Sequence, residues 1–103
     1  MAKLGKGNEL EIPIILFENP VINFNGDLSW FVYGNEAFVE ATSYRERHKP
    51  IQPLCPAKFE NGKTILPQKV CDILKLDENS NISIYVKYGK LTLRKHIFYP
   101  EMR

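Results

Sequence analysis

The chain has 103 residues, the size of a single domain, and its 44% hydrophobic and 25% charged residues are typical of a folded protein rather than a disordered one. No apolar run approaches the ~18 residues of a membrane-spanning helix, and the N-terminus lacks a signal-peptide pattern, so we expect a cytoplasmic protein with no membrane partner. The net charge of +2 is too small to indicate nucleic-acid binding by itself.

Residues 9–41 are predicted to form an N-terminal β module. Apolar side chains alternate from Leu10 to Leu16, and Asn25-Gly26 and Gly34-Asn35 are two-residue sequences that favour β-hairpin turns. The resulting meander has apolar side chains on both faces, so we expect it to be covered on both sides. One face carries Val21, Leu28, Trp30, Val32, Ala37 and Val39, and the other carries Phe31, Tyr33 and Phe38.

Residues 42–56 are predicted to be a proline-rich, basic linker. The prolines at its end, Pro50, Pro53 and Pro56, exclude a helix and favour an extended path. The linker also contains a basic cluster, which is either a contact for an anion or part of a solvated connector. The cluster consists of Arg45, Arg47 and Lys49.

Residues 57–96 begin with a turn, a short strand and a helix. Asn61-Gly62 is the predicted turn, and the strand that follows ends at Pro67, a residue that suits the first turn of a helix. Val70, Ile73 and Leu74 have the spacing of a short amphipathic helix that runs from about Gln68 to Lys75.

A β-hairpin is predicted at the end of this segment. Pairing across Tyr88-Gly89 sets Val86 opposite Leu91 and Ile84 opposite Leu93, with all four side chains on one face. This face is too small to form a core alone, so a second layer must cover it.

The order of a strand, a short helix that starts at a proline, a polar loop and a two-stranded hairpin makes residues 57–96 resemble the AbrB/MazE/SpoVT family of swapped-hairpin DNA-binding domains. The residues that carry the resemblance are Lys58–Pro67, Ile73–Leu76, Ser83–Val86 and Gly89–Leu93. The family pattern is a basic residue, a strand ending in Ile-Pro, a helix ending in Leu-Gly-Leu and a hairpin closing on Ile-Val-Leu. The resemblance implies a mainly β fold with one short helix, in which two hairpins interlock into a small barrel, usually in a homodimer.

The second hairpin has two alternative sources: another chain, or the N-terminal module as a degenerate second copy in a single-chain pseudo-dimer. An offset of about 54 residues sets Pro13 against Pro67 and Ser29 against Ser83, as a duplication would. Pro20 counts against a duplication, because it interrupts the segment that would be the helix of the first copy.

The resemblance also implies a DNA-binding surface on the first strand, its preceding loop and the helix. The matching basic residues are Lys58, Lys63 and Lys69, with Arg45, Arg47 and Lys49 as further contacts from the linker. Cys71 and Asp72 stand where the transition-state regulators of the family have paired arginines, which removes two contacts and adds a repulsive charge. Residues 61–103 hold eight basic and four acidic residues, which favours an anionic partner there.

Two functions therefore compete. The first is a small transcriptional regulator that binds duplex DNA through these basic residues. The second is a protein-interaction module, an antitoxin or inhibitor of a partner protein, with little affinity for DNA. The expected protein interface consists of Tyr33, Phe38, Phe31, Ile84 and Leu93.

The sequence favours neither an enzyme nor a metal or cofactor site. It contains no glycine-rich phosphate loop, nucleophile elbow or HExxH motif. The potential zinc ligands have no pair at the roughly two-to-four-residue spacing of a zinc knuckle. These ligands are His48, Cys55, Cys71 and His96.

Overall fold

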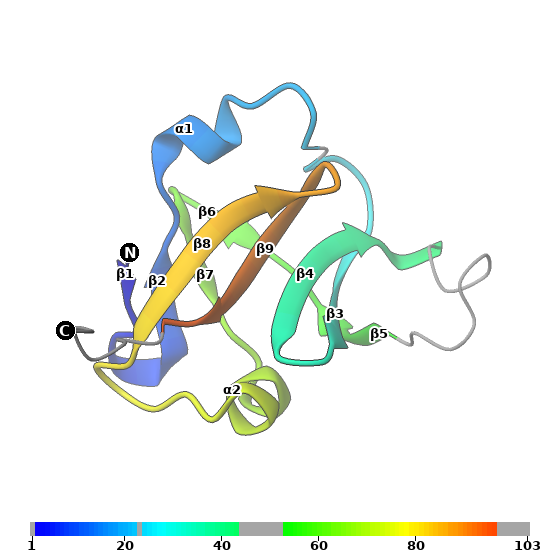
Figure 1. The fold of residues 1–103 in the computed structure, drawn as a ribbon. Coiled ribbons are helices and arrows are strands. Elements are labelled where there is room, and N and C mark those ends of the chain that lie inside the picture. Colours follow the sequence, from blue (N-terminus) through cyan, green and yellow to red (C-terminus); the bar gives the residue numbers. More distant parts are fainter. Residues whose placement is uncertain (1, 23, 44–52, 97–103) are drawn as a thin grey trace, which may run out of the picture.

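The backbone forms a six-stranded and a three-stranded antiparallel sheet, with short helices at opposite ends of the molecule (Figure 1). This computed structural model describes residues 2–22, 24–43 and 53–96. The large sheet has the order β1-β8-β9-β4-β3-β5 and the small sheet the order β2-β7-β6. The strands are β1 (Ala2–Lys3), β2 (Glu9–Glu11), β3 (Leu28–Tyr33), β4 (Glu36–Ala41), β5 (Pro53–Pro56), β6 (Phe59–Glu60), β7 (Lys63–Ile65), β8 (Asn81–Lys87) and β9 (Lys90–Lys95). The helices are η1 (Lys6–Asn8), α1 (Ile14–Phe17) and α2 (Gln68–Leu74).

The elements predicted in the C-terminal part are confirmed. Helix α2 follows Pro67 and ends one residue before the predicted end, because Lys75 adopts a left-handed conformation with φ of 58°. Strands β8 and β9 pair in the predicted register, with Ile84 opposite Leu93 and Val86 opposite Leu91. Local periodicity and turn residues were therefore sufficient to predict this region.

The prediction for residues 9–22 is partly wrong. Strand β2 ends at Glu11, and Pro13 starts the short helix α1 in place of the expected strand. Proline has no N–H to donate to a ladder, and its φ of −54° suits the start of a helix. Ile14 and Val21 are consequently exposed rather than part of a buried sheet face.

The predicted hairpin at Asn25-Gly26 is also wrong, whereas the one at Gly34-Asn35 is confirmed by the pairing of β3 with β4. The residues before Asn25 form a local turn around Asn19. Its Oδ1 accepts a hydrogen bond from the N–H of Val21 at 2.9 Å, and its carbonyl oxygen accepts one from Ile22 at 3.2 Å. These backbone groups are therefore not available to a strand ladder.

The hydrophobic core lies between the two sheets and extends under the helices α1 and α2. Phe17, Phe24 and Phe59 form an aromatic cluster, and Trp30 packs beside it with its ring centroid 6.3 Å from that of Phe59. Much of the remaining core consists of fully buried side chains from both parts of the chain. They include Leu4, Leu10, Leu66, Val70, Ile82, Leu91 and Leu93.

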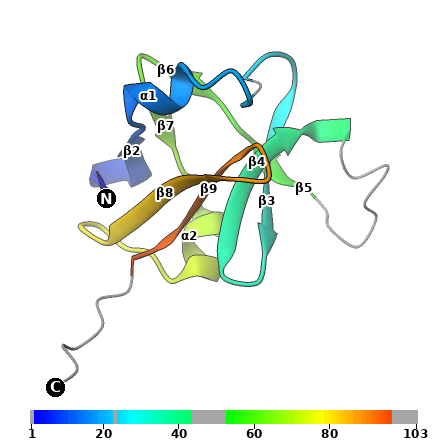
Figure 2. The ribbon, with the colours of Figure 1, turned by 45° about the horizontal axis from the view of Figure 1, so that its top comes forward.

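The chain consists of a first part, which contains β1 to β4, and a second part, which contains β5 to β9. The two parts repeat each other at the sequence spacing that separates Pro13 from Pro67, which we call the repeat offset. Strand β7 follows β2 by this offset, and β9 follows β4 by the same offset. These strands also pair with each other, β2 with β7 and β4 with β9 (Figure 2). At the centre of each pairing, a residue faces its own repeat equivalent: Leu10 faces Thr64 and Phe38 faces Thr92. An approximate two-fold axis therefore passes through both pairs.

The backbone hydrogen bonds follow the repeat offset as well. The N–H of Thr42 donates to the carbonyl of Asp27 at 2.9 Å, and at the equivalent positions that of His96 donates to Asn81 at 2.8 Å. Between the parts, Ile12 N–H donates to Gly62 and Leu66 N–H donates to Asn8, both at 2.9 Å, and these two bonds exchange under the offset. The four contacts make the two parts equivalent in their hydrogen bonding.

A side-chain contact also recurs at the repeat offset. The hydroxyl groups of Ser29 and Thr42 are 2.7 Å apart, and the hydroxyl of Ser83 lies 2.8 Å from Nδ1 of His96. Ser83 and His96 are the repeat equivalents of Ser29 and Thr42. The repeat therefore extends to individual polar side chains as well as to the backbone.

The edge strands of the large sheet cross between the two parts. Strand β1 pairs with β8, and β5, which is the end of the predicted linker, pairs with β3. In the described residues the sheet stays open between these two edges, so the expected closed barrel is not formed. The reason is that β2, β6 and β7 pair in a separate small sheet and do not join the large sheet.

Candidate functional site

Two of the predicted DNA contacts, Lys58 and Lys63, lie at one hollow beside the small sheet. The hollow has a volume of about 550 Å³, and both lysines are exposed. Strand β7 places Lys63 at its start, directly after the Asn61-Gly62 turn. The remaining lining residues are Glu9, Pro56, Glu60, Asn61, Thr64 and Ile65.

This hollow has balanced charge. Lys63 Nζ lies 3.3 Å from Glu9 Oε1, and Glu60 also lines the hollow, so two carboxylates offset the two lysines. Both members of the ion pair are about half exposed, and such exposed pairs stabilise a protein by about 1 kcal/mol or less. A phosphate group can therefore compete with Glu9 for Lys63, at a cost in affinity.

The third predicted contact, Lys69, is exposed at the start of α2 and does not line this hollow. Its neighbour Gln68 donates to Asp72 Oδ1 at 2.8 Å and accepts from Asn8 Nδ2 at 3.2 Å. Cys71 is buried in the core, which raises the pKa of its thiol, with Asp72 adding to the shift. Cys71 therefore cannot contact a ligand on the surface.

The three lysines predicted to contact DNA occur only in the second part of the chain. The repeat equivalents of the three lysines are one buried apolar, one acidic and one exposed apolar side chain, and none is basic. Leu4, Glu9 and Ile15 stand at the positions equivalent to Lys58, Lys63 and Lys69. The further candidates Arg45, Arg47 and Lys49 lie outside the described residues.

The residues predicted for a protein interface are only partly accessible. Phe31 and Leu93 are fully buried, so neither can contact a partner in the folded chain. Phe38 and Ile84 are half-buried, and the ring of Phe38 stacks on that of Phe31 with 5.4 Å between centroids. Tyr33 is 69% exposed and remains the accessible member of the set.

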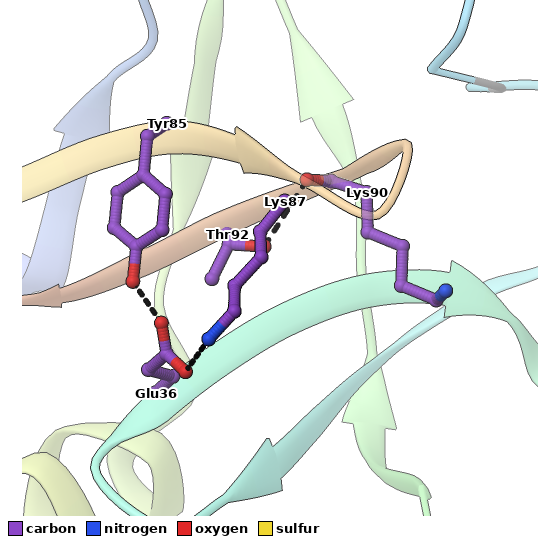
Figure 3. Close-up of polar contacts among 5 residues, drawn as sticks. All are labelled: Glu36, Tyr85, Lys87, Lys90 and Thr92. Atoms are coloured by element: carbon purple, nitrogen blue, oxygen red, sulfur yellow. Dashed lines mark hydrogen bonds and ion pairs between the residues drawn. The ribbon is translucent and has the colours of Figure 1, made fainter.

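A polar cluster on the outer face of the large sheet was not predicted from the sequence. Glu36 of β4 accepts a hydrogen bond from the Tyr85 hydroxyl at Oε2 and one from Lys87 Nζ at Oε1, the latter at 2.7 Å (Figure 3). Arg94 lies over the ring of Tyr85, with 5.9 Å from Cζ to the centroid. The cluster depends on the pairing of β4 with β9, which no local pattern indicates.

The cluster borders a second, mainly apolar hollow of about 150 Å³. Tyr33 and Tyr88 line it, and Tyr88 is 86% exposed. Lys90 also lines it, and its Nζ lies 3.7 Å from Oε2 of Glu40. The outer face thus combines exposed aromatic rings with charges that are largely paired.

The same contacts shift two pKa values. The hydrogen bonds from Lys87 and Tyr85 hold the pKa of Glu36 below its ordinary value of 4.5. Burial, and then the hydrogen bond to Glu36, raise the pKa of Tyr85 to about 12. The folded chain therefore favours ionised Glu36 and protonated Tyr85.

We expect the free energy of unfolding to fall as the pH drops below about 4.5. The unfolded chain then binds a proton at Glu36, whereas the folded chain, in which the pKa of this residue is lower, does not yet do so. The free energy of unfolding should also fall as the pH rises from about 10, the ordinary value for tyrosine, to about 12, since the unfolded chain ionises Tyr85 first. Urea unfolding measured across pH checks both limbs. Glu36→Gln should flatten the acid limb, whereas Glu78→Gln in the exposed loop serves as control. An unchanged acid limb in Glu36→Gln would contradict the prediction.

In the described part of the chain, no three His, Cys, Asp or Glu side chains gather where they could hold a metal ion. Cys55 and Cys71 are free thiols. Among the same residues, no helix is long and apolar enough to cross a membrane.

Comparison with known proteins identifies no relative: no protein-family model, curated protein or solved structure matches this chain.

Proposed function

We propose that the chain is a single-chain pseudo-dimer of two AbrB-like swapped-hairpin units, the first degenerate. The support is the constant repeat offset in strands, backbone hydrogen bonds and the Ser29–Thr42 and Ser83–His96 contacts. The pairing of β1 with β8 and of β5 with β3 links each hairpin to a strand of the other part, which fits the interlocked hairpins that the resemblance implies. On this proposal the second hairpin comes from the same chain, and a homodimer is not required.

We propose further that this pseudo-dimer is a regulator that binds duplex DNA on the small-sheet side. The observation that carries this proposal is the placement of Lys58 and Lys63, both exposed, at one hollow on β7 and its preceding loop. Since the equivalent positions in the first unit hold Leu4 and Glu9, only one unit contacts the duplex. We therefore expect weak binding to duplex DNA, with a Kd of about 10⁻⁴–10⁻⁶ M, which is typical of non-specific binding.

Two variants with opposite expected effects on DNA affinity test this proposal. Each is titrated with a labelled duplex at several salt concentrations. Lys63→Ala should weaken binding to all sequences and reduce the slope of log affinity against log salt by about 0.9. Glu9→Gln should strengthen binding, because it removes the carboxylate that lies 3.3 Å from Lys63. Lys95→Ala, on the large sheet, is the control and should change little. Equal effects of Lys63→Ala and Lys95→Ala would show that the small-sheet side is not the binding surface.

The second candidate function, a protein-interaction module, is favoured by the outer face of the large sheet. Tyr33 and Tyr88 are exposed there at the rim of an apolar hollow, and aromatic side chains commonly anchor protein interfaces. On this alternative the chain has no measurable duplex affinity at physiological salt. Tyr33→Ala should then abolish recovery of a partner in a pull-down without a change in thermal stability.

A further inference from the structure

The outer edge of β8 is paired over only part of its length. Strand β1 pairs with it at two positions, Ala2 with Ile82 and Lys3 with Asn81. In residues 2–22, 24–43 and 53–96, no strand lies beside Ser83–Lys87 on this edge. The sheet therefore presents an open edge over most of β8 (Figure 1).

The equivalent edge in the other part of the chain is covered. Strand β5 pairs with β3 at Ser29, Trp30 and Phe31, and its Leu54 packs against the core. Trp30 is fully buried, whereas its repeat equivalent on β8, Ile84, is half-buried. The extended segment β5 thus covers Trp30 on the first edge, whereas β1 covers the second edge only at Asn81 and Ile82 and does not reach Ile84.

The open edge has specific hydrogen-bonding groups. The carbonyl of Ser80 accepts from Leu4 on the β1 side, and that of Asn81 accepts from His96 on the β9 side. Backbone groups of successive residues alternate between the two sides of an antiparallel strand. The N–H and C=O groups of Ile84 and Val86 consequently face outward, where a further strand would bind them.

Charge indicates the kind of strand that would bind. Strands β1, β8 and β9 contain no acidic residue, whereas β3 and β4 contain no basic one. The basic side chains of the first group are Lys3, Lys87, Lys90, Arg94 and Lys95. Glu36 and Glu40 pair with Lys87 and Lys90, so the excess positive charge comes from Lys3, Arg94 and Lys95. Of these, Arg94 lies over the ring of Tyr85, a residue on the open stretch of β8. An acidic segment complements this edge best.

We propose that the outer edge of β8 binds an extended acidic segment of a partner protein by strand addition. Its backbone pairs with Ile84 and Val86, and its apolar side chains cover Ile84 as Leu54 covers the β3 edge. Its carboxylates lie on the opposite face of the added strand, beside Arg94 and the lysines of β1 and β8. Strand addition of this kind obtains affinity from backbone hydrogen bonds and specificity from alternate side chains. The proposal does not depend on DNA binding, since it concerns the other sheet.

The test uses the full chain and a labelled, end-blocked peptide Glu-Val-Glu-Val-Glu-Val as the probe. We expect saturable binding by fluorescence anisotropy, with slower amide exchange at Ile84 and Val86. The matched peptide Lys-Val-Lys-Val-Lys-Val should bind at least tenfold more weakly. Val86→Pro should abolish binding, because it removes an outward N–H while the ladder to β9 remains, and Val86→Ala should retain it.

The acidic peptide with N-methylated valines provides a test that leaves the protein unchanged, in case Val86→Pro does not fold. It should fail to bind, because it cannot donate backbone hydrogen bonds to the edge. Equal binding of the methylated peptide, retained binding to a folded Val86→Pro variant, or no binding of the acidic peptide would overturn the proposal. Concentration-dependent dimerisation that Val86→Pro abolishes would also overturn it, since a second copy would then occupy the edge.

Discussion

Replacing Leu93 with alanine is expected to lower the free energy of unfolding by about 2–5 kcal/mol, because the substitution leaves a cavity at a fully buried site. Leu93 lies on β9, opposite Ile84 of β8 and Ala37 of β4, where the two parts of the chain meet. A loss of this size is a large fraction of the ~5–15 kcal/mol that stabilises a typical domain. Urea unfolding followed by circular dichroism measures it. Leu93→Asp should prevent folding altogether, since it buries an unpaired carboxylate.

The matched control is Ile73→Ala on α2, whose side chain is 48% exposed. It removes a comparable apolar side chain from a site that solvent already reaches, so its cost should stay below about 1 kcal/mol. If the two substitutions lower the free energy of unfolding by the same amount, the packing of Leu93 where β4 pairs with β9 does not stabilise the fold in the way described.

A fragment of residues 57–103 is not expected to fold as a monomer. Without the first part of the chain, β7 loses its partner β2 and β9 loses its partner β4. Leu91 and Leu93, both fully buried in the intact chain, would then be exposed to water. The fragment should be unfolded or should dimerise, and circular dichroism with a light-scattering measurement of mass distinguishes these outcomes.

Mixing this fragment with residues 1–56 provides the control. The missing strands should restore a folded one-to-one complex, because all of the lost pairs are non-covalent. A well-folded monomer of the fragment alone would contradict both this prediction and the proposed pseudo-dimer, since each unit would then complete its own core.

The sequence predicted local features well where the decisive signal lies within a few residues. Pro67 and the spacing of Val70 and Leu74 indicated α2, and Tyr88-Gly89 predicted a hairpin whose register is the observed one. Both turn residues have positive φ, 52° and 72°, which a two-residue turn of this type requires. The lysines of the candidate DNA surface come from a local resemblance, and their role as DNA contacts stays a prediction.

The same local signals failed where several pairings compete. Asn25-Gly26 is a strong hairpin sequence, yet Val21 and Ile22 hydrogen-bond to Asn19 and β3 pairs elsewhere. Pro20 predicts an interrupted helix in the first part, but α1 ends at Phe17, before this proline. A short helix was therefore compatible with the prolines on both sides of it.

What the sequence by itself determined is the helix α2 and the hairpins β3–β4 and β8–β9 with their turns, since these depend on backbone preferences and periodicity over short distances. Only the tertiary structure decided the partners: β2 with β7, β4 with β9, and the crossing of β1 and β5. The Glu9–Lys63 ion pair, which reduces the charge of the candidate DNA surface, and the Glu36–Tyr85 contact both result from these pairings. Residues so far apart in the chain meet only because the two parts bury their apolar faces against each other. The pairing of the strands therefore depends on the whole core rather than on any local segment.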